Sequence, residues 1–190
     1  FQSLGDKLVS EPITVRILSP VCTSSMTVVD LPGLIAGGIE RQENHEQSHQ
    51  IVREYLNKPN VIVLYVSRFD VDVGSTNTYI LSEVQKKPND NVVFCFTHFD
   101  RACNDSDILV EDLTKSIKWT SDNITKGRPM FLLSLPKKTQ DLAKKELGLE
   151  TRVQEINKYD QKLLERKRVF IGMNKLKTSL RKRMHKHVMQ

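Results

Sequence analysis

The chain has 190 residues, 38% of them hydrophobic and 27% charged, a composition that is typical of a globular domain and argues against a disordered chain. Its longest apolar run, residues 61–66, is far too short to span a membrane. The net charge of +6 divides into +9 over residues 162–190, with ten Lys and Arg and one acid, and −3 over the remainder; neither part has the basic and aromatic patterning of a groove for single-stranded nucleic acid.

The first predicted elements surround a short Asp-x-x-Gly motif. Residues 13–18 alternate apolar and polar side chains, which predicts a half-buried strand. A second predicted strand, residues 26–29, ends at Asp30, because Pro32 and Gly33 prevent it from continuing. The connection between the two strands is too short for a parallel crossover, so we expect them to pair as an antiparallel hairpin.

After this hairpin the chain is predicted to alternate helices and strands. A helix over residues 43–57 leads to a strand over residues 60–66, whose continuous hydrophobicity predicts a central strand covered on both faces. The predicted elements that follow are a helix over residues 76–86, a strand over 91–96, a helix over 106–119, a strand over 130–133, and helices without strands after residue 139. This order predicts an α/β fold with a mostly parallel sheet and one antiparallel edge strand.

Polar residues follow three of the predicted strands at their carboxyl ends. Asp30 follows the second strand, Asp100 follows residues 91–96, and Ser134 follows residues 130–133. Because the carboxyl ends of parallel strands share one edge of a sheet, we expect these residues to meet at one crevice. Each acid also has an ordinary interpretation by itself: Asp30 precedes a Pro-Gly turn, and Asp100 suits a helix N-cap or an Asx turn.

Asp100 is suited to the recognition of one base. Its carboxylate can accept two hydrogen bonds, from the N1–H and the 2-amino group of guanine. Adenine lacks both donors in this arrangement, so it would leave a buried carboxylate unpaired and would be rejected.

Two sequence segments resemble the third GTPase motif of the dynamin superfamily: Pro12-Ile-Thr-Val-Arg-Ile-Leu-Ser-Pro20 and Met26-Thr-Val-Val-Asp-Leu-Pro-Gly-Leu34. The resemblance continues through Leu64-Tyr-Val-Ser67 and Thr97-His-Phe-Asp100, which stands where the family has Thr-Lys-x-Asp, and residues 171–180 are similar to the end of the family's GTPase domain. It implies a sheet like that of a P-loop GTPase, with helices on both faces and further helices at the C-terminus. Residues 1–140 would be a partial GTPase domain without the P-loop strand, and residues 141–190 its helical C-terminal part, which leads into a bundle or stalk helix.

The resemblance implies a phosphate side of the site, with GTP or GDP and Mg²⁺ as ligands. Asp30 would hold Mg²⁺ through water, and Gly33 would face the γ-phosphate, so these two are the implied catalytic residues. Leu31 and Pro32 lie between them in the same nucleotide-binding loop.

The resemblance also implies a base side and a dimer contact. Thr97, His98 and Asp100 would bind guanine, with Asp100 selecting it, and Ser134 would support the base from the other side. Asp72 stands in the loop that, in this family, reaches across a dimer of GTPase domains toward the partner's nucleotide.

Three departures from the family pattern bear on this site. His98 replaces the Lys whose stem normally lies along the base, although an imidazole is also able to stack there. Cys103 stands where many relatives have an acid, and residues 135–138 replace the usual Asn-Arg-Ser-Gln. These departures indicate a divergent member.

No Gly-x-x-x-x-Gly-Lys-Ser/Thr sequence occurs in the 190 residues, although this loop holds the phosphates in P-loop GTPases. By the resemblance, the loop and the first switch precede the position of Phe1, so we expect a piece of a longer protein that is inactive by itself. The absent strand would lie between residues 26–29 and 60–66. We therefore expect the isolated chain to be unstable or to aggregate through unpaired strand edges.

The leading hypothesis is a fragment of a dynamin-like GTPase that binds and hydrolyses GTP, self-associates through its GTPase domain and remodels membranes. Such a protein would be cytoplasmic and peripheral to membranes, without a nucleic-acid partner, and three cysteines without metal-ligand spacing favour a reducing compartment. The first alternative is a GTPase-like scaffold or interaction module that does not hydrolyse GTP.

The second alternative assigns the function to the basic C-terminal helix, which would bind a membrane surface or a nucleic acid. Its apolar residues recur every three or four positions, at Leu176, Leu180, Met184 and Val188. This spacing is more simply explained by packing against the rest of the domain, with the Lys and Arg side chains in solvent.

Overall fold

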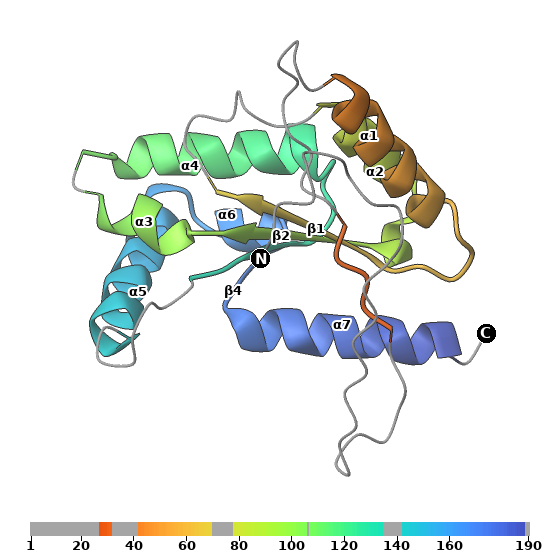
Figure 1. Cartoon of the computed structure of the whole chain (residues 1–190). Coiled ribbons are helices and arrows are strands. Elements are labelled where there is room, and N and C mark those ends of the chain that lie inside the picture. The colour runs from red at the N-terminus through yellow and green to blue at the C-terminus, as the bar shows by residue number, and fades with distance from the viewer. Residues whose placement is uncertain (1–26, 32–41, 70–77, 106, 135–141, 189–190) are drawn as a thin grey trace. The chain divides into compact units, whose positions relative to one another are not determined.

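The computed structural model describes residues 27–31, 42–69, 78–105, 107–134 and 142–188 (Figure 1). The chain divides into two compact units, Phe1–Pro59 and Asn60–Gln190. Among the described residues, the first unit contains helix α1 (Gln42–Leu56), and the second unit contains all of the strands.

Helix α1 confirms the helix that the sequence predicts over residues 43–57. Val52 and Leu56 are buried, and Ile51 and Tyr55 are half-buried. These four side chains share one face because helical neighbours lie three and four positions apart, so the predicted buried face is confirmed as well.

The strand predicted over residues 26–29 is wrong for the part that the structure describes. Thr27–Leu31 form neither strand nor helix, and Val28 is 76% exposed. A run of β-branched residues favours extended backbone, but a strand also requires a neighbour that accepts and donates its backbone hydrogen bonds. The predicted antiparallel partner, residues 13–18, lies outside the described residues, and no antiparallel strand is seen in those that are described.

The sheet of the second unit has four parallel strands in the order β1-β2-β3-β4. The strands are β1 (Val63–Arg68), β2 (Val92–Thr97), β3 (Met130–Leu132) and β4 (Val169–Ile171). The first three confirm the strands predicted over residues 60–66, 91–96 and 130–133. The expectation of helices without strands after residue 139 is wrong at β4, since three residues are too few to produce a recognisable period.

The described helices of this unit lie on both faces of the sheet, as predicted. They are α2 (Thr78–Gln85), η3 (Asn89–Asn91), α3 (Phe99–Asn104), α4 (Val110–Trp119), η4 (Thr120–Ile124), α5 (Leu142–Tyr159), α6 (Leu163–Arg166) and α7 (Met173–Val188). Helices α2 and α4 lie over one face and α7 under the other (Figure 1). Helix α5 packs against α3 and α4.

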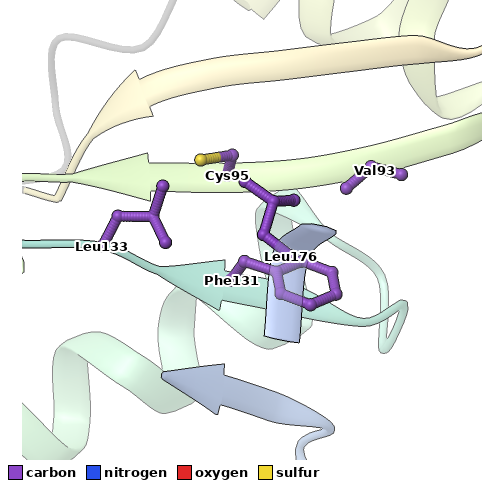
Figure 2. Close-up of a cluster of buried hydrophobic side chains, with 5 residues drawn as sticks. All are labelled: Val93, Cys95, Phe131, Leu133 and Leu176. Carbon is purple, nitrogen blue, oxygen red and sulfur yellow. The ribbon is translucent and has the colours of Figure 1, made fainter. Parts of the chain in front are cut away.

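Helix α7 contributes directly to the core beneath the sheet. Figure 2 shows Leu176 beside Val93 and Cys95 of β2 and Phe131 of β3, all of them buried. Leu180, one turn later, is partly buried against the same cluster. The apolar residues at helical spacing therefore pack on the sheet, which is what the simpler interpretation of this basic helix predicts.

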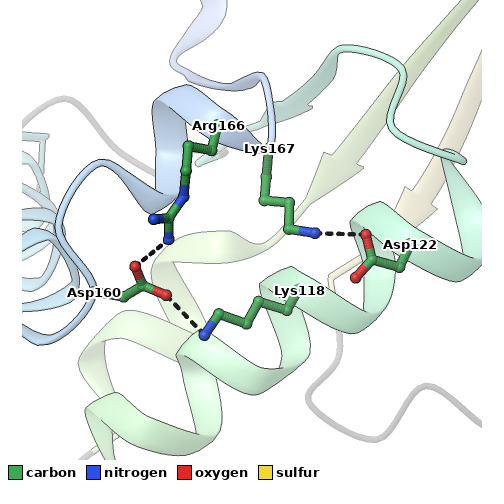
Figure 3. A network of polar contacts seen from close by, with 5 residues as sticks. All are labelled: Lys118, Asp122, Asp160, Arg166 and Lys167. Atoms are coloured by element: carbon green, nitrogen blue, oxygen red, sulfur yellow. Dashed lines mark hydrogen bonds and ion pairs between the residues drawn. The ribbon is translucent and has the colours of Figure 1, made fainter.

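A group of ion pairs joins the C-terminal end of α4 to the segment between α5 and β4 (Figure 3). Asp160 accepts hydrogen bonds from Lys118, at 2.7 Å, and from Arg166, while Lys167 reaches Asp122 of η4 at 2.7 Å. The hydrogen bond from Lys118 is the largest cause that lowers the pKa of Asp160, and the charge of Arg166 adds to it. The ion pairs of Asp160 therefore stabilise the folded state at neutral pH, and this stabilisation is lost as the pH falls through the lowered pKa of Asp160.

Strand β1 lies at an edge of the described sheet, which agrees with the expected unpaired edge beside residues 60–66, whereas the expectation that both of its faces are covered is wrong for the described residues. Strand β1 pairs there with β2 alone, and its Leu64 and Val66 are 43% and 57% exposed. They share a sheet face with Val93 and Cys95, their register partners, which α7 covers. Hydrophobicity shows that a strand can be buried, but only the neighbouring segments decide whether both of its faces are covered.

The exposed edge of β1 predicts the behaviour of the isolated 190-residue chain. A strand with an unpaired edge and exposed apolar side chains is a template for pairing between molecules. We expect the isolated chain to self-associate, and Val66→Lys to reduce this association because a charged edge residue opposes strand pairing. Light scattering coupled to size-exclusion chromatography measures both effects.

Val28→Lys is the matched control, since it adds the same charge at an exposed valine outside the described sheet. The prediction fails if the unmodified chain is monomeric and melts cooperatively. It also fails if both variants reduce association equally.

Candidate functional site

Backbone hydrogen bonds tie three strand ends together at the carboxyl edge of the sheet. The amide of Phe69 donates to the carbonyl of Thr97 at 2.8 Å, and the amide of Leu133 donates to the carbonyl of Phe96 at 2.8 Å. The amide of Phe99 then donates back to the carbonyl of Leu133 at 3.1 Å. The ends of β1, β2 and β3 are therefore held at fixed positions relative to one another.

His98 makes the transition from β2 to α3 with an unusual backbone. Its φ of 63° lies in the left-handed region, which costs free energy for a residue with a Cβ and persists only where the surroundings impose it. The turn directs the amide of the next residue, Phe99, toward the neighbouring strand end. Such outliers cluster at functional sites, and this one lies within the predicted base-binding motif.

The imidazole of His98 is tethered by Thr97. The Thr97 hydroxyl lies 3.3 Å from the carbonyl oxygen of Ser67 and 2.9 Å from Nδ1 of His98. The hydrogen bond between the Thr97 hydroxyl and Nδ1 of His98 holds the ring at the carboxyl end of β2.

Asp100 lies in the first turn of α3 and is only 5% exposed. The N-cap position of this helix is occupied by His98, so the N-cap interpretation of Asp100 is wrong. A buried carboxylate is retained only where partners compensate for the loss of water. Asp100 does interact with other residues, but a carboxylate has about four acceptor sites, so further donors can be bound.

Phe99 anchors the start of α3 beneath this carboxylate. Its side chain is fully buried, and its ring meets that of Phe69 edge to face at a centroid distance of 5.2 Å. Phe69 in turn meets Phe96 of β2 edge to face at 6.5 Å. The three rings fix the direction in which α3 leaves the sheet, and with it the position of Asp100.

Ser134 follows β3 directly beside this motif, because its neighbour Leu133 accepts the hydrogen bond from Phe99. The hydroxyl oxygen of Ser134 is buried and has no hydrogen-bond partner among the described residues. A buried hydroxyl without a partner carries a desolvation cost that a bound polar ligand would remove. The backbone hydrogen bond thus places the segment of Ser134 next to the segment of Thr97, His98 and Asp100, and a role for these residues in nucleotide binding stays a prediction.

The phosphate side of the predicted site belongs to the first unit. Asp30 is exposed and Leu31 is half-buried. Pro32 and Gly33, and also Asp72 of the predicted dimer loop, lie outside the described residues. The expected meeting of Asp30 with Asp100 at one crevice therefore stays a prediction.

Two features of the site were not predicted from the sequence. Helix α3 is not among the predicted helices and enters only through the N-cap interpretation of Asp100, although Phe99, Ala102 and Cys103 are buried at the helical spacing of three and four. Arg152 of α5, which binds the C-terminal end of α3, was also not identified. Its contacts depend on segments that are far apart in the sequence.

Cys103 lies on α3 one turn after Asp100 and replaces the acid that many relatives have. Burial raises the pKa of its thiol to about 12, with Arg152 acting in the opposite direction and Asp100 in the same one. The thiol is therefore protonated at neutral pH and does not act as a substitute for the acid.

The described residues contain no group of three or more His, Cys, Asp or Glu side chains that are placed to hold a metal ion. Among the same residues, every helix is too short or too polar to cross a lipid bilayer.

Comparisons with known proteins agree with the motif. A sequence profile described as "Dynamin family" matches residues 2–99, just over half of the chain. Among curated proteins, the chain is 30% identical over 93 residues to "Dynamin-related protein 12A" from Glycine max and 31% identical over 91 residues to "Dynamin-related protein 5A" from the same species. It is 29% identical over 93 residues to "Phragmoplastin DRP1A" from Arabidopsis thaliana.

The matched regions cover 48%, 47% and 48% of this chain, respectively, but only 15% of each relative. No solved structure matches the chain.

Proposed function

The chain belongs to the dynamin family, and on this basis we propose that it is part of a GTPase domain that binds guanine nucleotide and, in the complete protein, hydrolyses GTP. The supporting observation is the hydrogen bond from Phe99 to Leu133. It joins the start of the Asp100 helix to the strand end that precedes Ser134, so that two segments flank one position at the carboxyl edge of the sheet. Ligands of parallel α/β sheets bind at this edge.

In the proposed complex, Asp100 recognises the base. One carboxylate oxygen accepts a hydrogen bond from N1–H of guanine, and the other accepts one from its 2-amino group. Adenine offers neither of these donors, so both oxygens would be left without them. The tethered imidazole of His98 stacks along the base in place of the Lys stem. The hydroxyl of Ser134, which has no described partner, binds from the opposite side.

The proposed hydrolysis uses the phosphate side of the site. Asp30 holds the cation through water, which its exposed carboxylate suits, and the amide of Gly33 contacts the γ-phosphate. Mg²⁺, when bound, supplies charge that neutralises the phosphate oxygens. Water attacks the γ-phosphorus, the bond to the bridging oxygen breaks, and GDP leaves with that oxygen.

A non-hydrolysing scaffold is the second candidate function, and His98 is the observation that favours it. The Lys of the family motif has a long aliphatic stem that lies along the base, whereas His98 has a shorter side chain whose Nδ1 is hydrogen-bonded to the Thr97 hydroxyl. Such a module would bind guanine nucleotide but would not hydrolyse GTP at a rate typical of an enzyme. A protein that binds GDP selectively but hydrolyses no GTP in the presence of Mg²⁺ would support this candidate.

The proposed cellular role is membrane remodelling by self-assembly of the complete protein, with Asp72 reaching toward a partner domain. The basic C-terminal helix is a weaker candidate for membrane contact. Its Leu176 is buried in the core and Leu180 is partly buried, so these apolar side chains are not available to a lipid surface.

The base preference tests the binding proposal directly. Isothermal titration of the full-length protein with GDP, inosine diphosphate (IDP) and adenosine diphosphate (ADP) is expected to rank the affinities in that order. IDP keeps N1–H but lacks the 2-amino group, so its affinity isolates one of the two hydrogen bonds to Asp100. Equal affinities for GDP and ADP would rule out guanine recognition.

Asp30→Ala tests the catalytic proposal. We expect Mg²⁺-dependent GTP hydrolysis by the full-length protein to fall roughly 100-fold, the usual scale for losing one electrostatic stabiliser of the transition state. Single-turnover phosphate release measures the rate, and GDP affinity shows that the base side is intact. Glu46→Ala, which removes another exposed acid of the same unit, serves as the control. Full activity of Asp30→Ala would remove this residue from the site.

A further inference from the structure

Arg152 of α5 binds the segment that follows the Asp100 helix. Its Nε donates to the carbonyl of Cys103 at 2.9 Å, and Nη2 lies 3.4 Å from the carbonyl of Asp105 and 3.2 Å from that of Ile108. The remaining nitrogen, Nη1, donates to Glu155 on the same helix at 3.0 Å. One guanidinium therefore gathers three backbone carbonyls that lie within six residues of one another.

These carbonyls belong to the end of α3 and to its connection with α4. The last carbonyls of any helix have no partner within the helix, and a cation at this end also interacts favourably with the helix dipole. Helix α3 has only six residues, too few to be stable by itself. Its geometry must therefore be imposed by its packing against α5, with Ala102 and Cys103 buried, and by contacts at its two ends.

At the N-terminal end, these contacts are the hydrogen bond from Phe99 to Leu133 and the burial of the Phe99 ring. At the C-terminal end, they are the hydrogen bonds from Arg152. Asp100 lies between the two attachments. If the C-terminal attachment is lost, the packing against α5 remains but the end of the helix is no longer fixed, so the carboxylate can shift away from the base.

We propose that Arg152 is a positioning residue for base recognition: it holds α3 so that Asp100 presents both carboxylate oxygens to guanine. This inference rests on the proposed guanine binding and extends it to a residue outside the sequence motif. Arg152 acts through α3, and its three nitrogens are all engaged with protein groups.

The planar fork of arginine explains why this residue type is required. Nε and Nη2 point in the same direction from a rigid group, so they can bind neighbouring carbonyls at once, whereas a lysine ammonium is a point charge on a flexible stem. A lysine at this position is able to reach one of the carbonyls but does not reproduce the set. We therefore expect Arg152→Lys to keep part of the guanine recognition and Arg152→Met to keep less of it.

Arg128 provides a matched control in the same unit. Its Nη2 donates to the carbonyls of Gln85 and Lys87, at 2.7 and 3.1 Å, at the C-terminal end of α2. Both arginines thus bind backbone carbonyls at the end of a helix, but among the described residues Arg128 makes no hydrogen bond or ion pair with α3 or with the candidate site. Arg128→Met and Arg152→Met are expected to destabilise the domain to a similar extent.

The test compares wild type, Arg152→Met, Arg152→Lys and Arg128→Met in the full-length protein. Isothermal titration with GDP and IDP gives the preference for the 2-amino group. We expect Arg152→Met to lower GDP affinity about tenfold, which corresponds to 1.4 kcal/mol, and to reduce the preference for GDP over IDP. Arg152→Lys should recover part of the GDP affinity and part of the preference for GDP over IDP. Arg128→Met should leave this preference unchanged.

Amide hydrogen exchange without nucleotide provides a second measurement. Arg152→Met is expected to speed exchange in residues 101–109, with little change in β2 and β3. An unchanged GDP to IDP preference in Arg152→Met would overturn the positioning role, as would an equal loss in Arg128→Met. If wild type itself does not prefer GDP over IDP, the proposed guanine recognition fails first, and this inference fails with it.

Discussion

Asp100→Asn is expected to reverse the base preference of the full-length protein from guanine to xanthine. The amide nitrogen of Asn donates where the 2-amino group of guanine also donates, so this contact becomes repulsive. Xanthine carries a carbonyl at the same position, which accepts from the Asn amide, while its N1–H still donates to the amide oxygen. The ratio of GDP affinity to xanthosine diphosphate affinity should change by about 10,000-fold, as in sites that depend on satisfied buried hydrogen bonds.

Competition binding with a fluorescent nucleotide, displaced by GDP or by xanthosine diphosphate, measures this ratio. Asp107→Asn is the control, because it makes the same chemical change at an exposed acid shortly after α3. A variant with Asn at position 100 that still prefers GDP would show that Asp100 does not contact the base. The burial of Asp100, which is only 5% exposed, makes the effect large, since solvent has little access to replace a lost partner.

Phe99→Ala is expected to have the largest effect on stability. The side chain is fully buried and meets Phe69 edge to face. Truncation of a buried Phe to Ala typically costs about 3–5 kcal/mol, through lost transfer free energy and the cavity that remains. Urea denaturation of the full-length protein, followed by a probe in this unit, measures the free energy of unfolding.

Phe170→Ala is a suitable comparison. Phe170 stacks on Phe131 but is 38% exposed, so its removal leaves a smaller cavity and should cost clearly less than 3 kcal/mol. Phe99→Ala should also weaken the preference for GDP over IDP, because α3 loses its N-terminal anchor. Equal destabilisation by the two variants would contradict the packing role that we assign to Phe99.

Much of the local structure was predictable from the sequence. The buried face of α1 and the position of β2 were predicted correctly, because a long helix has a strong periodic signal and β2 is a short, continuously apolar run. The clustering of Thr97, His98 and Asp100 near Ser134 was also anticipated. Polar residues that end adjacent parallel strands must share one edge of the sheet.

The errors arose where a residue pattern depends on partners elsewhere in the chain. Thr27–Val29 were predicted to form a strand from their β-branched side chains, but they have no strand among the described residues. Strand β1 was expected from its hydrophobicity to be covered on both faces, but Leu64 and Val66 are exposed in the described structure. In both cases the side chains permit a buried strand, whereas other segments decide whether the strand forms and whether it is covered.

The sequence by itself determined the α/β class, the main alternation of helices and strands from α1 to β3 and the residue types at the strand ends. These properties depend on neighbours within a few positions, so they are encoded locally. Only the tertiary structure decided that β4 extends the sheet, that Phe99 is hydrogen-bonded to Leu133 and that Arg152 holds the end of α3. Each of these contacts joins segments more than thirty residues apart, and their geometry is set by the packing of the whole unit rather than by any local pattern.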